Sequence, residues 1–356
     1  MLGRILPAYD WLRTYKRDYW PGDLAAGAVV AVMLVPQAMA YATLAGLPPV
    51  TGLYASLLPL VVYAAFGSSR HLAVGPVAIV SMIVLERCSY IAEPGTAEYI
   101  NAVLVLTVLV GAFQVAMGLL RLGFVVNFLS HAVVSGLTSA AAILIALSQL
   151  KHLLGIPLET QHSLVGVLAE SGRQIGRTHL PTLALGVGCM AFLLFFKRRW
   201  PRFPASIVMV FAAAAIVRVF RLDEAGVSIV GGVPAGLPHA GLPDFDLETL
   251  SALAPAALTI AVIGFVESIS IAQVVAVKQR YRIYPNRELG ALGLANIAAA
   301  LSSGLPVTGG FSRTAVNHQA GAKTGMAALV TAAIVLLTTL FLTPLFYYLP
   351  YAALAA

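Results

Sequence analysis

The sequence predicts an all-α polytopic membrane protein built as an inverted repeat of two seven-span halves, with about twelve spans present and the third and tenth helices broken at the midplane. Three observations predict this fold. The 356 residues are 59% hydrophobic and 10% charged, whereas soluble domains carry about 25% charged residues. Apolar segments of the length that a membrane span needs recur along the chain. Two polar, glycine-containing interruptions occupy corresponding places in the two halves.

Twelve apolar segments fit membrane spans. They cover residues 24–44, 52–66, 72–85, 102–120, 132–153, 180–196, 205–220, 254–277, 289–301, 310–320, 326–342 and 345–356. Several are shorter than the roughly 20 residues of a full crossing. Residues 1–23 then form a basic, aromatic segment at the cytoplasmic membrane surface, 24–220 the first repeat, 221–253 an extracellular or periplasmic loop, and 254–356 an incomplete second repeat.

The positions of Lys and Arg predict the orientation. With the N-terminus in the cytoplasm, fifteen of the 22 basic residues fall inside and six outside, as the positive-inside rule expects for a multi-pass protein of the inner (plasma) membrane. The net charge of +7 is spread over these short loops, which excludes a nucleic-acid partner. Cys88 and Cys189 have neither disulfide nor metal spacing. The seven histidines also lack metal-site spacing, and His71 is expected at the membrane interface.

An internal repeat relates the two halves. The stretch SSRHLAVGPVAI from Ser68 and the stretch SSGLPVTGGFSR from Ser302 both reach a glycine seven residues on, Gly75 and Gly309. Gln37 and Glu267 also correspond, each alone among apolar neighbours. The offsets are 234 and 230 residues. Because the first and eighth spans lie an odd number apart, they cross in opposite directions, which is typical of secondary transporters with inverted repeats.

The broken segments predict an anion site. Irregular backbone is tolerated at membrane depth where it is buried in protein or lines a cavity. Half-helices that begin near Gly75 to Ala78 and near Gly310 to Arg313 would point two N-termini, each with free N–H groups and about half a positive charge, at one point. Arg313 adds a full charge and Ser312 a donor. The alternatives for Arg313 are a structural pair with Glu267, a side chain that reaches the cytoplasmic surface, or a pair with Glu267 that forms in one state and separates in another.

Glu267 is the candidate for ion coupling. A carboxylate within the membrane that can be neutral or charged can carry a proton together with substrate. Sodium binding helped by the Ser268 and Ser270 hydroxyls is the alternative, and a single structural hydrogen bond is a third reading. Gln37 and Tyr41 lie one helical turn apart and can face the same cavity. No metal, cofactor or catalytic constellation is predicted beyond this proton or sodium ion, so the sequence does not indicate an enzyme.

Four stretches resemble one known family. LPPVTGLYASLLPLVVYAAFGSSRHLAVGPVA from Leu47, VPQAMAYA, FVESISIA and GGFSRTAVN are similar to the sulfate permease (SulP) anion transporters, whose mammalian relatives include prestin. The resemblance covers essentially the whole chain. It implies a fourteen-helix fold with core and gate domains, followed by a cytoplasmic STAS domain, and a homodimer in the full-length form. The last two helices and the STAS domain are expected to lie beyond this sequence.

The resemblance also implies site residues and substrates. It places the anion beside Gln37 and Tyr41, Val77 and Ala78, and Phe311, Ser312 and Arg313, with Glu267 as the coupling acid. Bacterial relatives move sulfate, bicarbonate or dicarboxylates such as fumarate, with protons or sodium. The favoured function is proton-coupled symport of such a small anion. An anion exchanger or channel, a sodium-coupled symporter, a nucleobase symporter, and a membrane sensor or motor are the alternatives.

Overall fold

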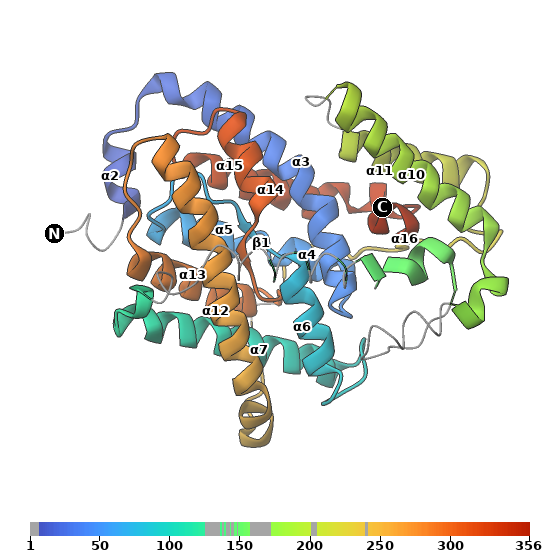
Figure 1. Cartoon of the computed structure of the whole chain (residues 1–356), viewed down its shortest axis with the longest axis horizontal. Coiled ribbons are helices and arrows are strands. Elements are labelled where there is room, and N and C mark those ends of the chain that lie inside the picture. Colours follow the sequence, from blue (N-terminus) through green and yellow to red (C-terminus); the bar gives the residue numbers. More distant parts are fainter. Residues whose placement is uncertain are drawn as a thin grey trace. The chain divides into compact units, whose positions relative to one another are not determined.

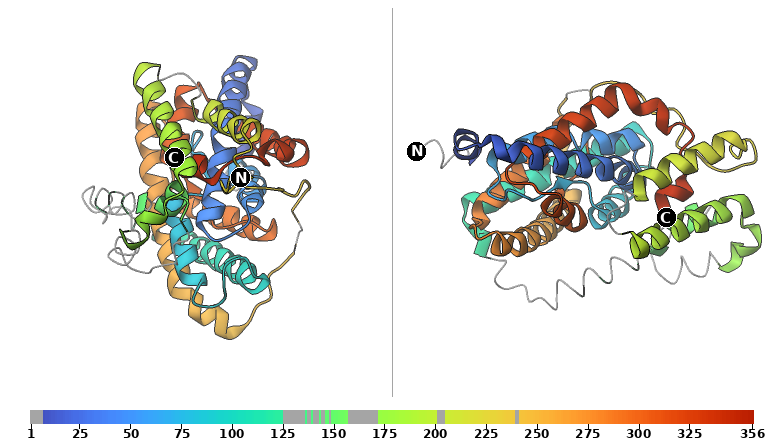
Figure 2. Two further views of the ribbon diagram at one scale, coloured as in Figure 1. Left: turned by 90° about the vertical axis from the view of Figure 1, so that its right-hand side faces the viewer. Right: turned by 90° about the horizontal axis from the view of Figure 1, so that it is seen from above.

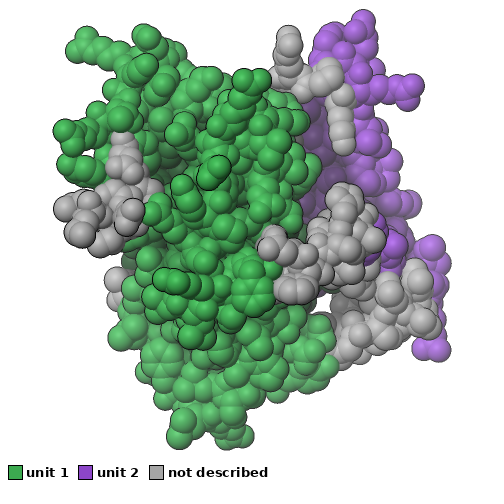
Figure 3. Space-filling model, turned by 60° about the vertical axis from the view of Figure 1, so that its left-hand side comes forward, with its two compact units in different colours: residues 1–134, 236–339 green, residues 135–235, 340–356 purple. Residues whose placement is uncertain are grey.

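The computed structural model describes residues 7–124, 136, 139, 143, 146–147, 149–156, 172–200, 205–238 and 241–356. The chain divides into two compact units, which Figure 3 colours separately. Unit 1 comprises Met1–Val134 and Gly236–Thr339, and unit 2 comprises Ser135–Ala235 and Leu340–Ala356. The predicted span 132–153 falls mostly outside the described residues.

Unit 1 consists of helices and one short β-ribbon (Figure 1). Its elements are α2 (Pro7–Arg13), η1 (Arg17–Tyr19), α3 (Trp20–Leu44), α4 (Pro49–Tyr54), α5 (Leu58–Phe66), β1 (Val74–Gly75), α6 (Ala78–Cys88), α7 (Ala97–Leu119), α12 (Leu247–Lys278), α13 (Pro285–Leu301), β2 (Thr308–Gly309), α14 (Phe311–Gln319) and α15 (Met326–Leu337). A π-helical turn, η4 (Thr338–Leu342), continues α15 into unit 2.

Five helical segments among the described residues are long and apolar enough to cross a membrane: Arg17–Leu44, Pro49–Phe66, Ala97–Leu119, Leu247–Lys278 and Met326–Phe346. Leu180–Phe196 and Val208–Val219 are shorter apolar helices. The predicted number of twelve spans therefore stays a prediction, because several crossings in such a fold are made by short or broken helices.

Glycines allow a close contact between two helices of unit 1, α7 and α13. A Cβ atom on Gly111 would lie 2.7 Å from the Gly293 carbonyl oxygen, and one on Gly293 would lie 2.6 Å from the Gly111 carbonyl oxygen. Such distances exclude any side chain, so the two backbones approach each other directly. The small residues therefore hold together two helices that are 166 to 204 positions apart in the sequence. In a membrane environment, apolar burial between helices contributes little to such a contact.

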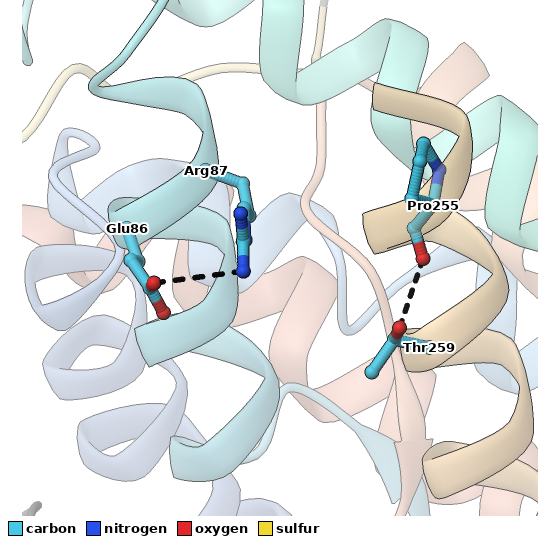
Figure 4. Close-up of polar contacts among 4 residues, drawn as sticks. All are labelled: Glu86, Arg87, Pro255 and Thr259. Carbon is cyan, nitrogen blue, oxygen red and sulfur yellow. Dashed lines mark hydrogen bonds and ion pairs between the residues drawn. The ribbon is translucent and has the colours of Figure 1, made fainter. Parts of the chain in front are cut away.

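Helix α12 begins earlier than the sequence predicted. Its start at Leu247 rather than 254 follows from Asp246, whose carboxylate accepts a hydrogen bond from the Thr249 amide (3.0 Å) and caps the helix. The helix continues through Pro255, and the Thr259 hydroxyl donates to the Pro255 carbonyl (2.8 Å; Figure 4). The segment 221–253, predicted as a loop, is correspondingly shorter at its end.

Unit 2 contains η3 (Ile175–Arg177), α10 (Leu180–Arg199), α11 (Ala205–Val219), η5 (Thr343–Phe346) and α16 (Tyr351–Ala355). Helices α10 and α11 lie side by side and both contact α16 (Figure 2). The expected span 345–356 is not one helix. Pro344 directly precedes it and Pro350 interrupts it. The chain around Leu349 instead pairs with the segment near Val230, whose amide donates to the Leu349 carbonyl (2.8 Å).

Candidate functional site

The two stretches that the sequence identified as a repeat meet in unit 1. Strands β1 and β2 pair antiparallel, with Val74 opposite Gly309 and Gly75 opposite Thr308. The Gly310 amide extends this pairing by donating to the Ala73 carbonyl (3.0 Å). Each strand leads directly into a short helix, α6 after β1 and α14 after β2. The prediction of two broken segments with related structure is thus confirmed.

Both short helices begin without a side-chain cap. Val77 precedes α6 and Gly310 precedes α14 in extended backbone conformation, and neither helix start donates a backbone hydrogen bond to a capping side chain. The first-turn N–H groups of a helix need acceptors and carry partial positive charge. The starts at Ala78 and Phe311 are therefore able to bind an anion.

Arg313 lies in the first turn of α14 and is 2% exposed. Its Nη1 donates to Gln37 Oε1 on α3 at 3.3 Å. Its Nε and Nη2 are buried, and no acceptor within the described part of the chain meets them. The side chain is buried within the protein, which argues against the alternative that it reaches the cytoplasmic surface. A buried cation with unused donors is costly unless a ligand or water completes its hydrogen bonds.

Two glycines make the space that Arg313 occupies. A Cβ atom on Gly310 would lie 2.7 Å from both Cζ and Nη2 of Arg313, and one on Gly75 would lie 3.4 Å from Nη2. The guanidinium group is therefore packed against both broken segments. Gly310 is required for this position, whereas Gly75 has slightly more room.

Glu267 lies on α12, and its Oε2 is buried with no hydrogen-bond partner among the residues described. The two ion pairs of the described chain are the surface pairs Glu86–Arg87 (3.7 Å; Figure 4) and Arg221–Glu224 (3.5 Å). Glu267 and Arg313 interact electrostatically without forming an ion pair, so the alternative of a structural pair is not seen among the described residues.

The hydroxyls next to Glu267 have other partners. Ser268 Oγ lies 2.7 Å from Thr308 Oγ1 and accepts a hydrogen bond from the Gly309 amide (2.8 Å). Ser270 donates to the Val266 carbonyl (2.6 Å). Ser268 thus attaches β2 to α12 and sets the position of the second broken segment relative to the helix that carries Glu267.

The remaining predicted site residues lie around this centre. Tyr41 is partly buried on α3, and its hydroxyl is within electrostatic reach of Arg313. Val77 is buried, Ala78 is partly buried, and both stand at the start of α6. Phe311 and Ser312 are exposed, Phe311 by 67%. The structure thus brings Gln37 into contact with Arg313 and places the others on the same elements, while their roles stay predictions.

A buried amide pair supports the second broken segment and was missed at the level of sequence. Asn296 on α13 donates from Nδ2 to the Val307 carbonyl (3.0 Å) and to Gln114 Oε1 on α7 (2.9 Å), and its Oδ1 accepts from the Val307 amide (2.7 Å). These contacts fix the chain just before β2. Two amides within apolar spans were the available signal, but their partners lie up to 182 positions away.

Comparison with known proteins identifies the family and relatives that this chain is similar to. The chain matches the model of the sulfate permease family over residues 21–356. It is 41% identical over 361 residues to the chloroplastic sulfate transporter 4.1 of Arabidopsis thaliana, covering 99% of this chain and 52% of that protein. It is 36% identical over 350 residues to a probable sulfate transporter of Mycobacterium tuberculosis (strain CDC 1551 / Oshkosh), covering 98% and 62%. The chain thus spans about half of the plant relative's length.

Solved structures share the fold. The murine Solute Carrier 26 family member A9 anion transporter in the inward-facing state superposes with a TM-score of 0.94 at 27% identity, covering 99% of this chain and 62% of that one. The transmembrane domain of the cyanobacterial bicarbonate transporter BicA superposes with a TM-score of 0.86 at 24% identity, covering 96% and 87%. These likenesses confirm the predicted all-α, inverted-repeat membrane fold.

The family match and the long, closely related sulfate transporters agree with the resemblance seen in the sequence. This chain belongs to the sulfate permease family, a family of multi-pass membrane anion transporters rather than enzymes.

Proposed function

We propose that this protein is a secondary active transporter that moves sulfate together with protons by alternating access. The observation that carries the proposal is Arg313, a buried cation with two nitrogens that no acceptor in the described chain meets. It lies beside two uncapped helix starts. Donors that converge on one point without an acceptor are what a buried anion requires.

The charges of the site favour a dianion carried with a proton. Each helix start contributes about half a positive charge, so with Arg313 the site holds about two positive charges when Glu267 is neutral. A sulfate dianion balances them. With Glu267 ionised, about one positive charge is left for the anion. A dianion and a proton on Glu267 therefore favour each other, and this reciprocal linkage is the basis of coupling.

Sulfate suits the site better than the other two anions considered. The relatives that are 36–42% identical over nearly the whole chain are named as sulfate transporters. A dicarboxylate needs a second group of donors at some distance from the first, and Gln37 Oε1 is already engaged as an acceptor by Arg313. Bicarbonate carries a single charge and gains less from a site with two.

All the predicted site residues belong to unit 1, and we propose that this unit is the moving transport core. The finer localisation, the inner (plasma) membrane with a cytoplasmic N-terminus, and a homodimer in the full-length protein belong to the same proposal. The excess of Lys and Arg in the predicted inner loops supports the orientation.

Uptake into proteoliposomes tests this function. Radiolabelled sulfate, fumarate and bicarbonate would be offered to the full-length protein with an inward proton gradient, an inward sodium gradient, or neither. We expect proton-driven sulfate uptake that the variant Glu267→Gln reduces to the gradient-independent level, with sulfate binding retained, because glutamine keeps the size of the side chain but cannot take up a proton. Sodium-driven uptake, or gradient-driven uptake that survives in Glu267→Gln, would refute proton coupling through this residue.

A further inference from the structure

His71 joins the loop that precedes β1 to the loop that follows α14. It lies in the loop between α5 and β1 and is 3% exposed. Its Nε2 is 3.0 Å from the Ala322 carbonyl, in the loop after α14, and its Nδ1 is 3.1 Å from the Tyr281 hydroxyl. A carbonyl oxygen can only accept, so Nε2 carries the proton and Nδ1 accepts from Tyr281 in the neutral ring.

Each of these loops is also held by a buried carboxylate. Glu288, in the first turn of α13, accepts from the Ser68 amide (2.6 Å), the Ser69 amide (3.0 Å) and the Tyr63 hydroxyl (2.5 Å). Asp23, in the first turn of α3, accepts from the amides of Lys323 (2.6 Å) and Thr324 (3.0 Å). Both carboxylates are fully buried. The loops are thus anchored to separate helices and meet at His71.

Hydrogen bonds connect the backbone around His71 to the proposed anion site. The His71 carbonyl accepts from Asn317 Nδ2 on α14 (2.9 Å). Two residues on, the Ala73 amide donates to Thr314 Oγ1 (3.1 Å), and the Ala73 carbonyl accepts from the Gly310 amide (3.0 Å). A shift of the loop at His71 therefore moves the residue that precedes α14, and with it the donors of both helix starts.

We propose that His71 is a positioning residue of the anion site, which fixes the spacing of the α6 and α14 starts through the Nε2–H bond to Ala322. The inference rests on the proposed function for its effect on anion affinity. Its structural part, the constraint on β1 and β2, stands independently. The proposed role depends on one N–H donor at the Nε2 position. Variants whose side chains place an N–H group at different positions can therefore distinguish this hydrogen bond from a role in packing alone.

The surroundings of His71 keep the ring neutral. Burial, together with the positive charges that face the ring, lowers its pKa to about 4, against the raising effect of the Ala322 carbonyl. The ionisable groups around it are Arg70, Tyr281, His318 and Lys323, with Glu288 reached through Ser69 and Tyr281. Protonation would turn Nδ1 into a donor toward Tyr281 and reverse that bond.

The matched variants His71→Gln and His71→Asn test the proposal. A glutamine amide reaches the position of Nε2 and can donate to Ala322, whereas the shorter asparagine amide lies near Nδ1 and cannot. In sulfate uptake by the full-length protein, we expect KM to rise about tenfold in His71→Asn with little change in Vmax, as the loss of one buried hydrogen bond predicts, and to stay within about twofold of wild type in His71→Gln.

Hydrogen exchange measured by mass spectrometry provides a readout that does not depend on transport. Amides of 73–81 and 308–316 should exchange faster in His71→Asn than in wild type or His71→Gln. Faster exchange with no sulfate uptake by the wild type would refute the proposed function and leave the positioning role supported. Equal exchange in all three proteins, or equal loss of affinity in the two variants, would overturn the role of the Nε2–H bond.

Two further measurements extend the test, and the first of them needs no histidine variant. Tyr281→Phe removes the hydroxyl that hydrogen-bonds Nδ1 and so supports the Nε2–H tautomer set by the Ala322 carbonyl. We expect faster exchange in 73–81 with KM raised about threefold. Unchanged exchange and KM would overturn the proposal. In wild type, the folded state favours neutral His71, so its contribution to stability should be present above about pH 6.5 and decline as pH falls toward 4. His71→Gln should lack this component, and an identical pH profile would contradict the assignment.

Discussion

The two broken segments of this protein share a backbone plan and differ in chemistry. Each places a two-residue strand before a short uncapped helix, and the strands pair with each other. At the repeat offset of 234 positions, Val77, Ala78 and Ile79 correspond to Phe311, Ser312 and Arg313. The first segment is thus apolar where the second carries a hydroxyl and a buried charge. The repeated backbone supplies convergent helix starts, and the asymmetric side chains supply specificity for a negatively charged ligand.

Removing the charge of Arg313 should abolish the chemical difference between the two segments and have the largest effect on sulfate affinity. In Arg313→Met, a side chain of similar length loses the guanidinium, and sulfate affinity should fall by more than about 100-fold, because two charge-assisted hydrogen bonds are worth roughly 3–6 kcal/mol. Equilibrium binding of radiolabelled sulfate measures it. Arg87→Met on the exposed end of α6 is the matched control and should bind normally.

The same variant should not destabilise the protein. Arg313 is a buried cation without an ion-pair partner among the described residues, and replacing such a charge by an apolar group is often neutral or stabilising. Thermal unfolding in detergent without sulfate should therefore show an equal or higher midpoint for Arg313→Met. A clearly lower midpoint together with normal sulfate binding would show that Arg313 is a structural residue.

A smaller effect should distinguish the two glycines that face Arg313. Gly310→Ala would place its Cβ 2.7 Å from the guanidinium, and Gly75→Ala would place its Cβ 3.4 Å away. We expect sulfate affinity to fall about tenfold in Gly310→Ala, as displacing a charge-assisted donor predicts, and less in Gly75→Ala. Gly290→Ala has open space around it and is the control. Equal losses at both glycines would show that the two segments contribute alike.

The broken segments and the charged site residues could be predicted from the sequence because the residues that form them are recognisable in short stretches. Glycines and hydroxyls within apolar segments indicated broken spans, and the repeat offset related one to the other. The sequence identified Arg313 and Glu267 as charged residues within predicted spans. A charge there costs free energy, and it therefore indicates a functional role. The sequence could not show whether these two side chains form an ion pair, because the same two residues fit both a pair and two separate groups.

The supporting contacts were missed because they join distant parts of the chain. Asn296 meets Gln114 across 182 positions, and His71 meets Ala322 across 251. Nothing beside His71 in the sequence shows that the loop is buried in the protein, so the sequence predicted only a position at the membrane interface. Boundaries failed for local reasons: Asp246 starts α12 early through its cap, and prolines divide the expected span 345–356.

The central claim is that an anion binds between the starts of α6 and α14 next to Arg313. Selenate, a sulfate analogue with an anomalous scattering signal, tests it in crystals of the full-length protein. We predict an anomalous peak between Ala78 and Phe311, with selenate oxygens at hydrogen-bond distance from Arg313 Nη2, about 2.7–2.9 Å for a charge-assisted bond, and with the peak absent in Arg313→Met. A peak elsewhere in the protein, or an unchanged peak in that variant, would contradict the account.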